Sequence, residues 1–320
     1  MILALIGVIP PGCGHPGMPV GGQSFYFDTI CQVTVYSLDS HENERERAQE
    51  IIDGAFLLCA GYEKLLSRTK EGSDIDRINS SGGRTVSCDS HTLEVIRRGI
   101  LWGERSHGRF DITIGGVSEL WDFHPEKPRL PEDAQIREAL DHVDYRLIEI
   151  GDGGVRLKDP EAKLDLGGLA KGYIADRLGE YLRENGVTGA VVSLGGNVSV
   201  IGRKPGGGAF KVGVETPYSE RTEVSKILEL ADETAVTSGV YERFFEADGK
   251  KYHHILDPET GYPAETDLIS VTVTASEGSS CDCDALSTIC LILGEEEGKR
   301  FLAEQEGVEG VFIGEDGILP

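Results

Sequence analysis

The pattern of apolar and polar positions divides the chain into segments of helical and of strand period. Apolar residues recur every three or four positions over Glu42–Arg68 and over Ser90–His107, with charged residues between them. This spacing predicts two amphipathic helices. Phe25–Ser37 ends in an alternating β-branched run, which predicts a strand. The polar run Ser67–Asn79 is interpreted as a loop.

After the second helix, short strands and helices are interleaved without a regular strand–helix–strand order. This order favours an α+β fold, a single compact domain with largely antiparallel sheets packed against helices, over a doubly wound fold. We assign residues 23–320 to that domain and residues 1–22 to a tail. The further expected elements are a short strand and a Gly-Gly turn in Gly108–His124, a helix over Pro131–Asp141, a hairpin of Leu147–Ile150 with Val155–Leu157, a helix within Lys163–Glu184, strands at Ala190–Leu194, Val198–Ile201, Phe210–Val214, Ile227–Leu230 and Ser270–Thr274, a helix ending near Leu293, and a helix followed by a strand in Gly298–Ile313.

The N-terminal tail has features of a secretory segment. Its apolar start, MILALIGVI, is followed by Gly12-Cys13, which is similar to the site where bacterial lipoproteins receive a lipid. A basic start is missing, so a short apolar tail or a first strand is the alternative. Pro10–Gly22 is rich in Pro and Gly and is expected to be a flexible linker. We therefore predict an extracytoplasmic protein anchored to the membrane at Cys13.

Composition narrows the function classes. The net charge of −24 argues against a nucleic-acid partner, because phosphate backbones are bound by basic patches. The chain has seven cysteines, and the pair Cys281 and Cys283 has C-x-C spacing instead of the C-x-x-C of redox and zinc motifs. Buried or inert thiols are favoured over a metal or redox site.

Three segments carry candidate chemistry, and the first is the helix start before Leu293. Ser and Asp residues precede its apolar run, and Asp284 and Thr288 are four apart on one helical face. A carboxylate and a hydroxyl near a helix N-terminus suit a hard cation and a phosphate. The alternative is an ordinary capped helix whose acidic residues interact with its own dipole.

The second segment is LDLGGLAKGYIAD. Gly167 and Gly168 allow close approach of backbone to a ligand, and their N–H groups at a helix start could face phosphate. Asp165 could accept hydrogen bonds from a ribose or an adenine amine, and Lys171 could neutralise a phosphate. A plain glycine turn with Lys171 in solvent is the alternative.

The third segment is HHILDPETGYP. His253 and His254 are neighbours in a predicted strand, so their side chains point to opposite faces. At most one of them enters a given site, where a histidine is a natural general base or acid. Either residue alone is more commonly structural. Motifs of dinucleotide, P-loop, serine-hydrolase and zincin proteins are absent from the sequence.

Taken together, five ordered segments resemble the FAD:protein FMN transferase family, also called ApbE-like flavin transferases. The segments are GRFDITIGGVSELWDFH, LDLGGLAKGYIAD, VVSLGGNVSVIG, TSGVYERFFEADGKKYHHILDPETGYP and CDALST. The resemblance implies an α+β enzyme that uses Mg²⁺, cleaves FAD, attaches FMN through a phosphoester to a Thr or Ser of a target protein, and releases AMP. It implies acceptors that are membrane redox-pump subunits or flavin-bearing electron-transfer proteins.

The resemblance also implies roles for particular residues. It assigns His254 to proton transfer from the acceptor hydroxyl and Asp284 to catalysis through the metal. Two positions depart from the family pattern, because Phe27 stands near an expected Met-Gly-Thr and Thr69 stands where a Tyr is usual. The implied metal ligands are the Gly168 carbonyl, Asp284, Ser287 and Thr288, and the implied FAD contacts are Phe27, Thr69, Arg109, Phe110, Asp111, Asp165, Lys171 and Leu256.

Other functions remain open at this point. An FAD pyrophosphatase would use the same site with water as the acceptor. A non-catalytic flavin-binding protein would keep the glycine and aspartate positions without needing the metal side chains or His254. A C-x-C metal-binding protein is the least favoured. The most informative experiment is to incubate the protein with FAD, Mg²⁺ and a candidate Thr-bearing target and to measure the mass added to the target.

Overall fold

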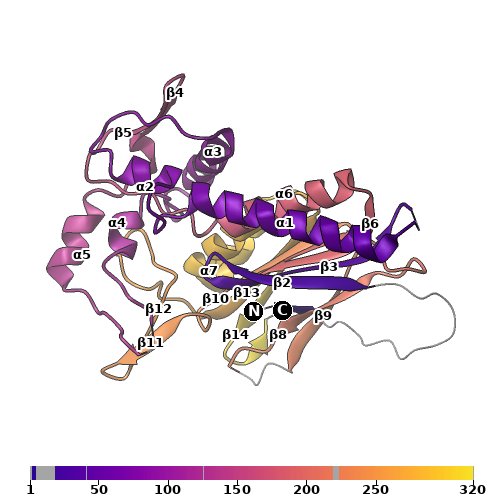
Figure 1. Ribbon diagram of the computed structural model, residues 1–320. Helices are drawn as coiled ribbons and strands as arrows, with labels where there is room; N and C mark the ends of the chain where they lie inside the picture. Colours follow the sequence, from indigo (N-terminus) through magenta and orange to yellow (C-terminus); the bar gives the residue numbers. More distant parts are fainter. Residues whose placement is uncertain (1, 5–18, 41, 125, 219–222, 320) are drawn as a thin grey trace.

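The main body of the protein has three layers (Figure 1). Helices cover one face of a large antiparallel sheet, and a smaller, three-stranded sheet packs on its other face. The computed structural model describes the chain except for residues 1, 5–18, 41, 125, 219–222 and 320. Its helices are α1 (Glu44–Leu66), α2 (Asp74–Asn79), α3 (Ser90–Arg105), α4 (Gly115–Ser118), α5 (Asp133–Leu140), the 3₁₀ turn η1 (Tyr145–Leu147), α6 (Ala170–Glu184) and α7 (Ser280–Ala303). Its strands are β1 (Ile2–Ala4), β2 (Val20–Tyr26), β3 (Thr29–Leu38), β4 (Ile148–Gly151), β5 (Gly154–Leu157), β6 (Val187–Leu194), β7 (Asn197–Gly202), β8 (Phe210–Glu215), β9 (Val224–Leu230), β10 (Glu233–Gly239), β11 (Phe244–Ala247), β12 (Lys250–His253), β13 (Leu268–Ser276), β14 (Val308–Gly314) and β15 (Gly317–Ile318).

The eight-stranded sheet has the order β15-β14-β13-β10-β7-β6-β3-β2, and its neighbouring strands pair antiparallel. Its side chains alternate between two cores, as the two-residue period of a strand requires. On β6, Val192 faces the core under the helices, whereas Val191 packs with Phe210 and Val212 of the three-stranded sheet β1-β8-β9. This confirms the expected α+β fold with largely antiparallel pairing.

Helix α7 lies buried against the sheet and next to α6. Its apolar residues occur all around the helix, including Leu286, Ile289 and Leu291, each at most 1% exposed. A helix that is apolar on every side is stable only when it is enclosed. The sheet and α6 therefore hold α7 from two sides, and with it every functional group on its first turns.

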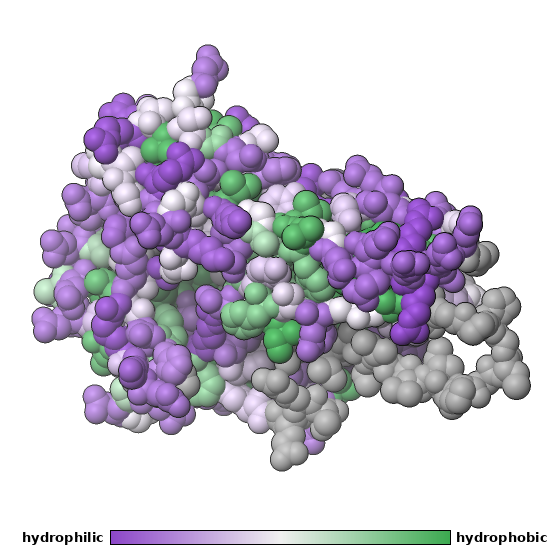
Figure 2. Space-filling view, viewed as in Figure 1, coloured by the Kyte–Doolittle hydropathy of each residue, from purple (hydrophilic) through white to green (hydrophobic). Residues whose placement is uncertain are grey.

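A smaller group of elements lies beside the sheet at the left of Figure 1 and carries α2 to α5 and two hairpins, β4-β5 and β11-β12. Part of it packs around Trp121, which contacts Val117, Ile136 and Phe245 and donates from its indole N–H to the Gly261 carbonyl (3.0 Å). Figure 2 shows that hydrophilic side chains cover most of the visible face, in keeping with the strongly acidic composition.

Several local predictions were wrong. Phe25–Ser37 is a hairpin whose turn residues Phe27 and Asp28 have positive φ angles of 54° and 57°. Such turns favour Asn-Gly, so the pair gave no turn signal. The expected loop Ser67–Asn79 contains α2, which begins after a Ser73 cap that accepts from the Asp76 N–H (2.9 Å). The Gly-Gly turn opens α4, and α7 continues past a break at Gly294.

The N-terminal segment is only partly described. β2 begins at Val20, so the sheet includes residues that we assigned to the tail, and Ile2–Ala4 forms β1 beside β8. The prediction at Cys13 lies outside the described residues. In the part of the chain that is described, none of the helices has the length and apolar character needed to cross a bilayer.

Candidate functional site

The predicted metal-binding side chains come together on the first turns of α7. Asp284 is 5% exposed, and one of its carboxylate oxygens accepts the Gly172 N–H of α6 (3.0 Å). Thr288 lies one turn further along the same face and is partly exposed. The prediction that Asp284 and Thr288 share a helical face is confirmed. The buried carboxylate thus lies behind an accessible hydroxyl.

The glycine turn before α6 lies against this face. A Cβ placed on Gly168 would be 3.9 Å from Thr288 Oγ1 and 2.9 Å from the ring of Phe110. The second distance is shorter than real Cβ contacts, so only glycine lets the backbone pass here without a shift of the ring. The main chain at Gly168, the Thr288 hydroxyl and the Asp284 carboxylate therefore form one cluster.

The groups around Asp284 shift the pKa of its carboxyl in opposite directions. Burial raises the pKa of this carboxyl most strongly, and the nearby Glu242 carboxylate raises it further. The Lys171 ammonium and the Gly172 N–H lower the pKa by stabilising the ionised form. Lys171 itself donates to the Gly195 carbonyl (3.3 Å). A second cation at the cluster would offset the burial cost that Lys171 only partly relieves.

The donor set suits Mg²⁺ better than a transition metal. Among the described residues, no three His, Cys, Asp or Glu side chains are placed to hold a metal ion together. One carboxylate, one hydroxyl and one carbonyl are hard oxygen donors, and Mg²⁺ usually takes one or two carboxylates together with substrate phosphates. Cys281 and Cys283 are both buried, and burial raises the pKa of each thiol, so both remain in the inert form.

The helix N-termini are less available to a phosphate than the sequence suggested. Asp176 of α6 accepts the N–H groups of Ser280 (2.8 Å) and Cys281 (3.0 Å) and so caps α7. The Gly167 N–H donates to Asp165 (2.9 Å) within its own turn. The expectation that these N–H groups face a ligand is wrong for Gly167 and for the start of α7, because carboxylates already occupy them.

Asp165 and the residue before it are held in place by Arg68, which follows α1, and by Asn79 of α2. The second carboxylate oxygen of Asp165 pairs with the Arg68 guanidinium (3.0 Å). Asn79 of α2 binds Leu164, the residue before Asp165. Its side-chain amide accepts the Leu164 N–H (2.7 Å) and donates to the Leu164 C=O (2.9 Å). Thr69 is exposed, and its hydroxyl lies 3.1 Å from that of Ser67, its hydrogen-bond partner among the described residues. In this loop Arg68 therefore reaches Asp165, whereas the sequence drew attention to Thr69.

The segment Arg109 to Asp111 divides into three different environments. The Arg109 guanidinium pairs with Asp257 (3.3 Å) and Glu259 (2.9 Å) of the turn after His254. The Phe110 ring packs on Gly168. Asp111 is buried, and its oxygens accept from Thr113 (2.6 and 2.8 Å) and from the Tyr145 N–H (2.9 Å). These bonds use the carboxylate to brace η1, and the predicted contact of Asp111 with FAD stays a prediction.

The two histidines have opposite surroundings, as their position in a strand predicts. His253 is 7% exposed, and its Nε2–H donates to the Ala264 carbonyl (3.1 Å). His254 is only partly buried, and its Nδ1 lies 3.3 Å from the Arg243 carbonyl. A carbonyl only accepts, so Nδ1 carries the proton, and the lone pair of Nε2 has no hydrogen-bond partner among the residues that the structure describes.

The electrostatic surroundings keep the His254 ring neutral. Burial lowers the pKa of His254 below its usual value, and the Arg243 and Lys171 cations lower it further. Because Lys171 acts on both His254 and Asp284, it links the histidine to the α7 cluster. The neutral ring is the form that can accept a proton.

Phe27 and Leu256 lie at the edges of this region. Phe27 is in the β2-β3 turn, where its N–H donates to Glu63 of α1 (2.8 Å). Leu256 is buried in the cluster around Trp121 and pairs through its backbone with Pro263. Its side chain therefore belongs to a core, which leaves the backbone for the contact that the sequence predicted.

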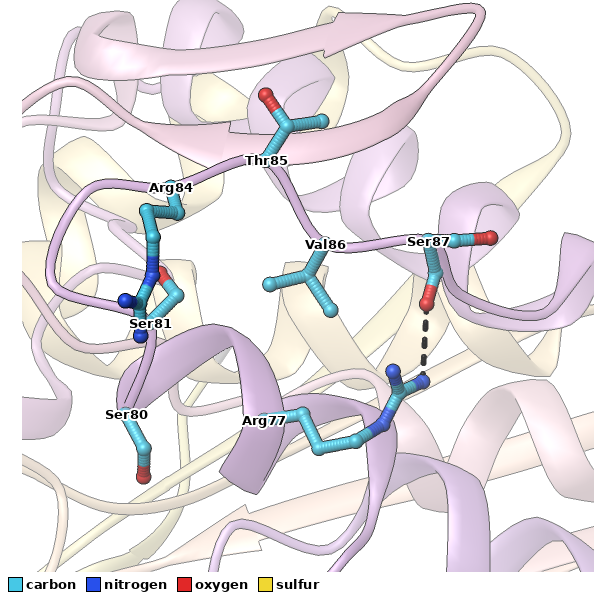
Figure 3. A pocket seen from close by; sticks show the side chains of 7 residues that line it. All are labelled: Arg77, Ser80, Ser81, Arg84, Thr85, Val86 and Ser87. Carbon is cyan, nitrogen blue, oxygen red and sulfur yellow. Dashed lines mark hydrogen bonds between the residues drawn. The ribbon is translucent and has the colours of Figure 1, made fainter.

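A separate cavity of about 470 Å³ lies beside α2 and does not overlap these residues. Figure 3 shows Arg77 donating to the Ser87 carbonyl (2.9 Å) across it. Arg77 also pairs with Asp74, so its charge is neutralised locally. The cavity is lined by Arg77, Ser80, Ser81, Arg84, Thr85, Val86 and Ser87, none of which the sequence linked to the site.

Sequence reasoning gave no role to Ser238, Glu242, Arg68 or Asn79. Ser238 and Glu242 lie inside one of the five recognised segments, TSGVYERFF, so the signal was present. Arg68 and Asn79 lie at the two ends of the early polar run. The partners of Ser238, Asn79 and Arg68 are between 49 and 97 positions away along the chain, which no local pattern reveals.

Comparisons with known proteins agree with this arrangement. A profile of the ApbE family matches residues 27–312. An FAD:protein FMN transferase of Treponema pallidum (strain Nichols) is 33% identical over 301 residues, which is 89% of this chain and 82% of that protein. One of Klebsiella pneumoniae (strain 342) is 34% identical over 81% of this chain and 80% of its own length.

Solved structures share the fold. The crystal structure of an ApbE protein from Thermotoga maritima superposes with a TM-score of 0.84 at 31% identity, covering 94% of this chain and 96% of that one. The flavinyl transferase ApbE of Pseudomonas stutzeri, in its apo form, gives a TM-score of 0.79 at 27% identity, covering 94% and 92%.

Proposed function

The chain belongs to the ApbE family, and on that premise we propose that it is a Mg²⁺-dependent FAD:protein FMN transferase. It joins FMN by a phosphoester bond to a Thr or Ser of a target flavoprotein and releases AMP. The observation that carries the proposal is the convergence of Asp284, Thr288 and the Gly168 turn beside Lys171 and His254.

The α7 cluster is the part of the chain that would hold the metal. The Asp284 carboxylate, the Thr288 hydroxyl and the Gly168 carbonyl supply hard oxygen donors, and bound Mg²⁺ would neutralise charge on the FAD pyrophosphate. Lys171 adds fixed positive charge at the same place. Phosphoryl transfer asks a protein mainly for positioning and charge stabilisation, which these groups provide.

His254 is the proposed general base. The acceptor hydroxyl gives its proton to Nε2 as its oxygen forms a bond to the FMN phosphorus. The bond from that phosphorus to the bridging oxygen breaks, and AMP leaves with the oxygen. The Nδ1–H bond to the Arg243 carbonyl holds the ring in the tautomer that this step requires.

The flavin and adenine ends are assigned to the two sides of the cluster. Phe27, at the β2-β3 turn, offers an aromatic face to the isoalloxazine ring. Asp165, held by Arg68, is assigned to the adenosine part. The proposed partner is an acceptor protein with an accessible Thr or Ser, such as a membrane redox-pump subunit or a flavin-bearing electron-transfer protein.

A transfer assay tests the proposal. The purified chain is incubated with FAD, Mg²⁺ and a candidate acceptor, and the acceptor's mass and the released AMP are measured. We expect one FMN per acceptor Thr, equal amounts of AMP, and loss of both in Asp284→Asn or with excess chelator. AMP without labelled acceptor in every case would instead identify a pyrophosphatase, and tight FAD binding without AMP would identify a binding protein.

A further inference from the structure

We propose that Ser238 of β10 is a positioning residue that directs the lone pairs of the Thr288 hydroxyl toward the metal. This inference rests on the proposed function. Ser238 has no role in the sequence-based site, yet its Oγ lies 2.8 Å from Ser287 Oγ and 3.1 Å from Thr288 Oγ1. Three hydroxyls from two elements therefore form one chain.

The direction of this chain follows from counting protons. The Ser287 hydroxyl bonds to the Asp284 backbone carbonyl (3.0 Å). A carbonyl can only accept, so Ser287 uses its single proton there. In its contact with Ser238, Ser287 must then be the acceptor, and Ser238 the donor.

The same argument sets the orientation of Thr288. Ser238 donates its single hydroxyl proton to Ser287, so in the contact of Ser238 with Thr288 the threonine must be the donor. Thr288 thus directs its proton toward β10 and leaves its lone pairs free on the other side. A hydroxyl that binds a cation needs this orientation, because the proton must point away from the positive charge.

The geometry also separates the roles of Ser287 and Thr288. Ser287 is fully buried and takes part in two bonds of the chain, whereas Thr288 is partly exposed beside Gly168. Ser287 was predicted to be a metal ligand. The structure assigns it instead to the relay that ends on the Asp284 carbonyl, with Thr288 as the hydroxyl that reaches the metal.

The relay is supported by rigid elements. Ser238 pairs with Val271 near the centre of the eight-stranded sheet, and α7 packs directly on β10. Residues that orient metal ligands through hydrogen bonds commonly change metal affinity by about 10–100-fold when they are removed. Loss of the Ser238 hydroxyl should therefore weaken metal binding without altering the ligands.

The test compares Ser238→Ala with Ser270→Ala. Ser270 is a fully buried serine on β13, paired with Gly239, and its hydroxyl has no hydrogen-bond partner among the described residues. Titration calorimetry measures Mg²⁺ binding to each FAD-loaded protein, and FAD affinity is measured separately in chelator. We expect a Mg²⁺ Kd raised about 10–100-fold in Ser238→Ala, no change in Ser270→Ala, and unchanged FAD affinity in both.

Ser238→Thr and Ser287→Ala complete the set. The first keeps the hydroxyl and should restore the wild-type Mg²⁺ Kd. The second leaves Ser238 able to accept from Thr288, so it should weaken Mg²⁺ binding less than Ser238→Ala does. Thermal unfolding of each protein identifies any variant that is misfolded, and Ser238→Thr then decides the question.

Two results would overturn the relay. One is a Mg²⁺ Kd that is the same in Ser238→Ala and wild type. The other is a larger loss in Ser287→Ala than in Ser238→Ala, which would make Ser287 a direct ligand. A wild-type chain that neither binds Mg²⁺ with FAD nor transfers FMN would overturn the proposed function instead.

Discussion

At the scale of single residues, the two adjacent histidines show how surroundings decide chemical role. They have the same side chain and neighbouring positions, but His253 is enclosed by the core and His254 is partly open beside Arg243. Each ring donates from a different nitrogen to a carbonyl. Only His254 combines a lone pair that has no partner among the described residues with a place in reach of the α7 cluster's electrostatic field.

We therefore predict that His254→Ala slows FMN transfer by roughly 10²–10⁴-fold, the range for a positioned general base. FAD affinity should change little, because the base acts on the acceptor. His253→Gln is the matched control and should transfer FMN at neutral pH. Single-turnover transfer and FAD titration check both variants. The prediction fails if FAD affinity falls in proportion to the rate, or if His253→Gln is the inactive variant.

His253 also makes a prediction about stability. Burial lowers its pKa from 6.5 to about 4, so between these values the unfolded chain binds a proton here and the folded chain does not. The free energy of unfolding should then fall as the pH falls from 6.5 toward 4, by at most about 1.4 kcal/mol per pH unit from this residue. Urea unfolding at several pH values should show a shallower pH dependence in His253→Gln. Parallel curves for the two proteins would contradict the assignment.

At the scale of elements, the site depends on short segments that are fastened to one another by side chains. The turn that carries Asp165 and Gly168 lies between the bridge at Lys163 and the start of α6. Asn79 fixes its entry by bonding both backbone groups of Leu164. Helix α2 therefore positions the turn although none of its residues reaches the α7 cluster.

Asn79→Ala should lower the free energy of unfolding by about 1–3 kcal/mol, because it leaves the Leu164 N–H and C=O without their partner. It should also weaken FAD binding, since Asp165 follows directly. Asn185→Ala is the comparison, because among the described residues the Asn185 side chain bonds to the Tyr181 carbonyl of the adjacent helix α6 and to no distant segment. Denaturant unfolding and FAD titration measure the two effects. Equal stabilities for the two variants would show that the link to Leu164 is unimportant.

At the scale of the whole molecule, the N-terminal segment bears on the cellular location of the enzyme. We propose that the chain is anchored to the membrane at a lipid-modified Cys13 and works outside the cytoplasm. The Pro- and Gly-rich residues that follow Cys13 would act as a linker that lets the domain reach membrane-bound acceptors. This proposal rests on the sequence alone, because residues 5–18 are not described.

The expected result is that the native protein sediments with membranes and that Cys13→Ser shifts it to the soluble extracytoplasmic fraction. The folded domain should be unaffected, so transfer to a soluble acceptor fragment should continue at the same rate. Fractionation without detergent, with mass spectrometry of the N-terminal peptide, makes the measurement. A soluble cytosolic protein that retains Met1 would end the proposal.

The sequence by itself determined the type of most elements, because helical and strand periods depend on near neighbours along the chain. It also placed Asp284 and Thr288 on one face, and the order of its motifs led to the family. It did not indicate the Phe27-Asp28 turn, whose positive φ angles are imposed by strand pairing against residue preference.

Only the tertiary structure decided which polar groups are free to act. Asp111 and the Gly167 N–H are used internally, Asp176 caps α7, and Ser238 meets Thr288 from 50 positions away. Hydrogen bonds of this kind depend on how elements pack, and packing joins residues that no local pattern relates. The sequence determines which donors and acceptors a side chain has, but tertiary packing determines which of them remain available after its neighbours have formed their hydrogen bonds.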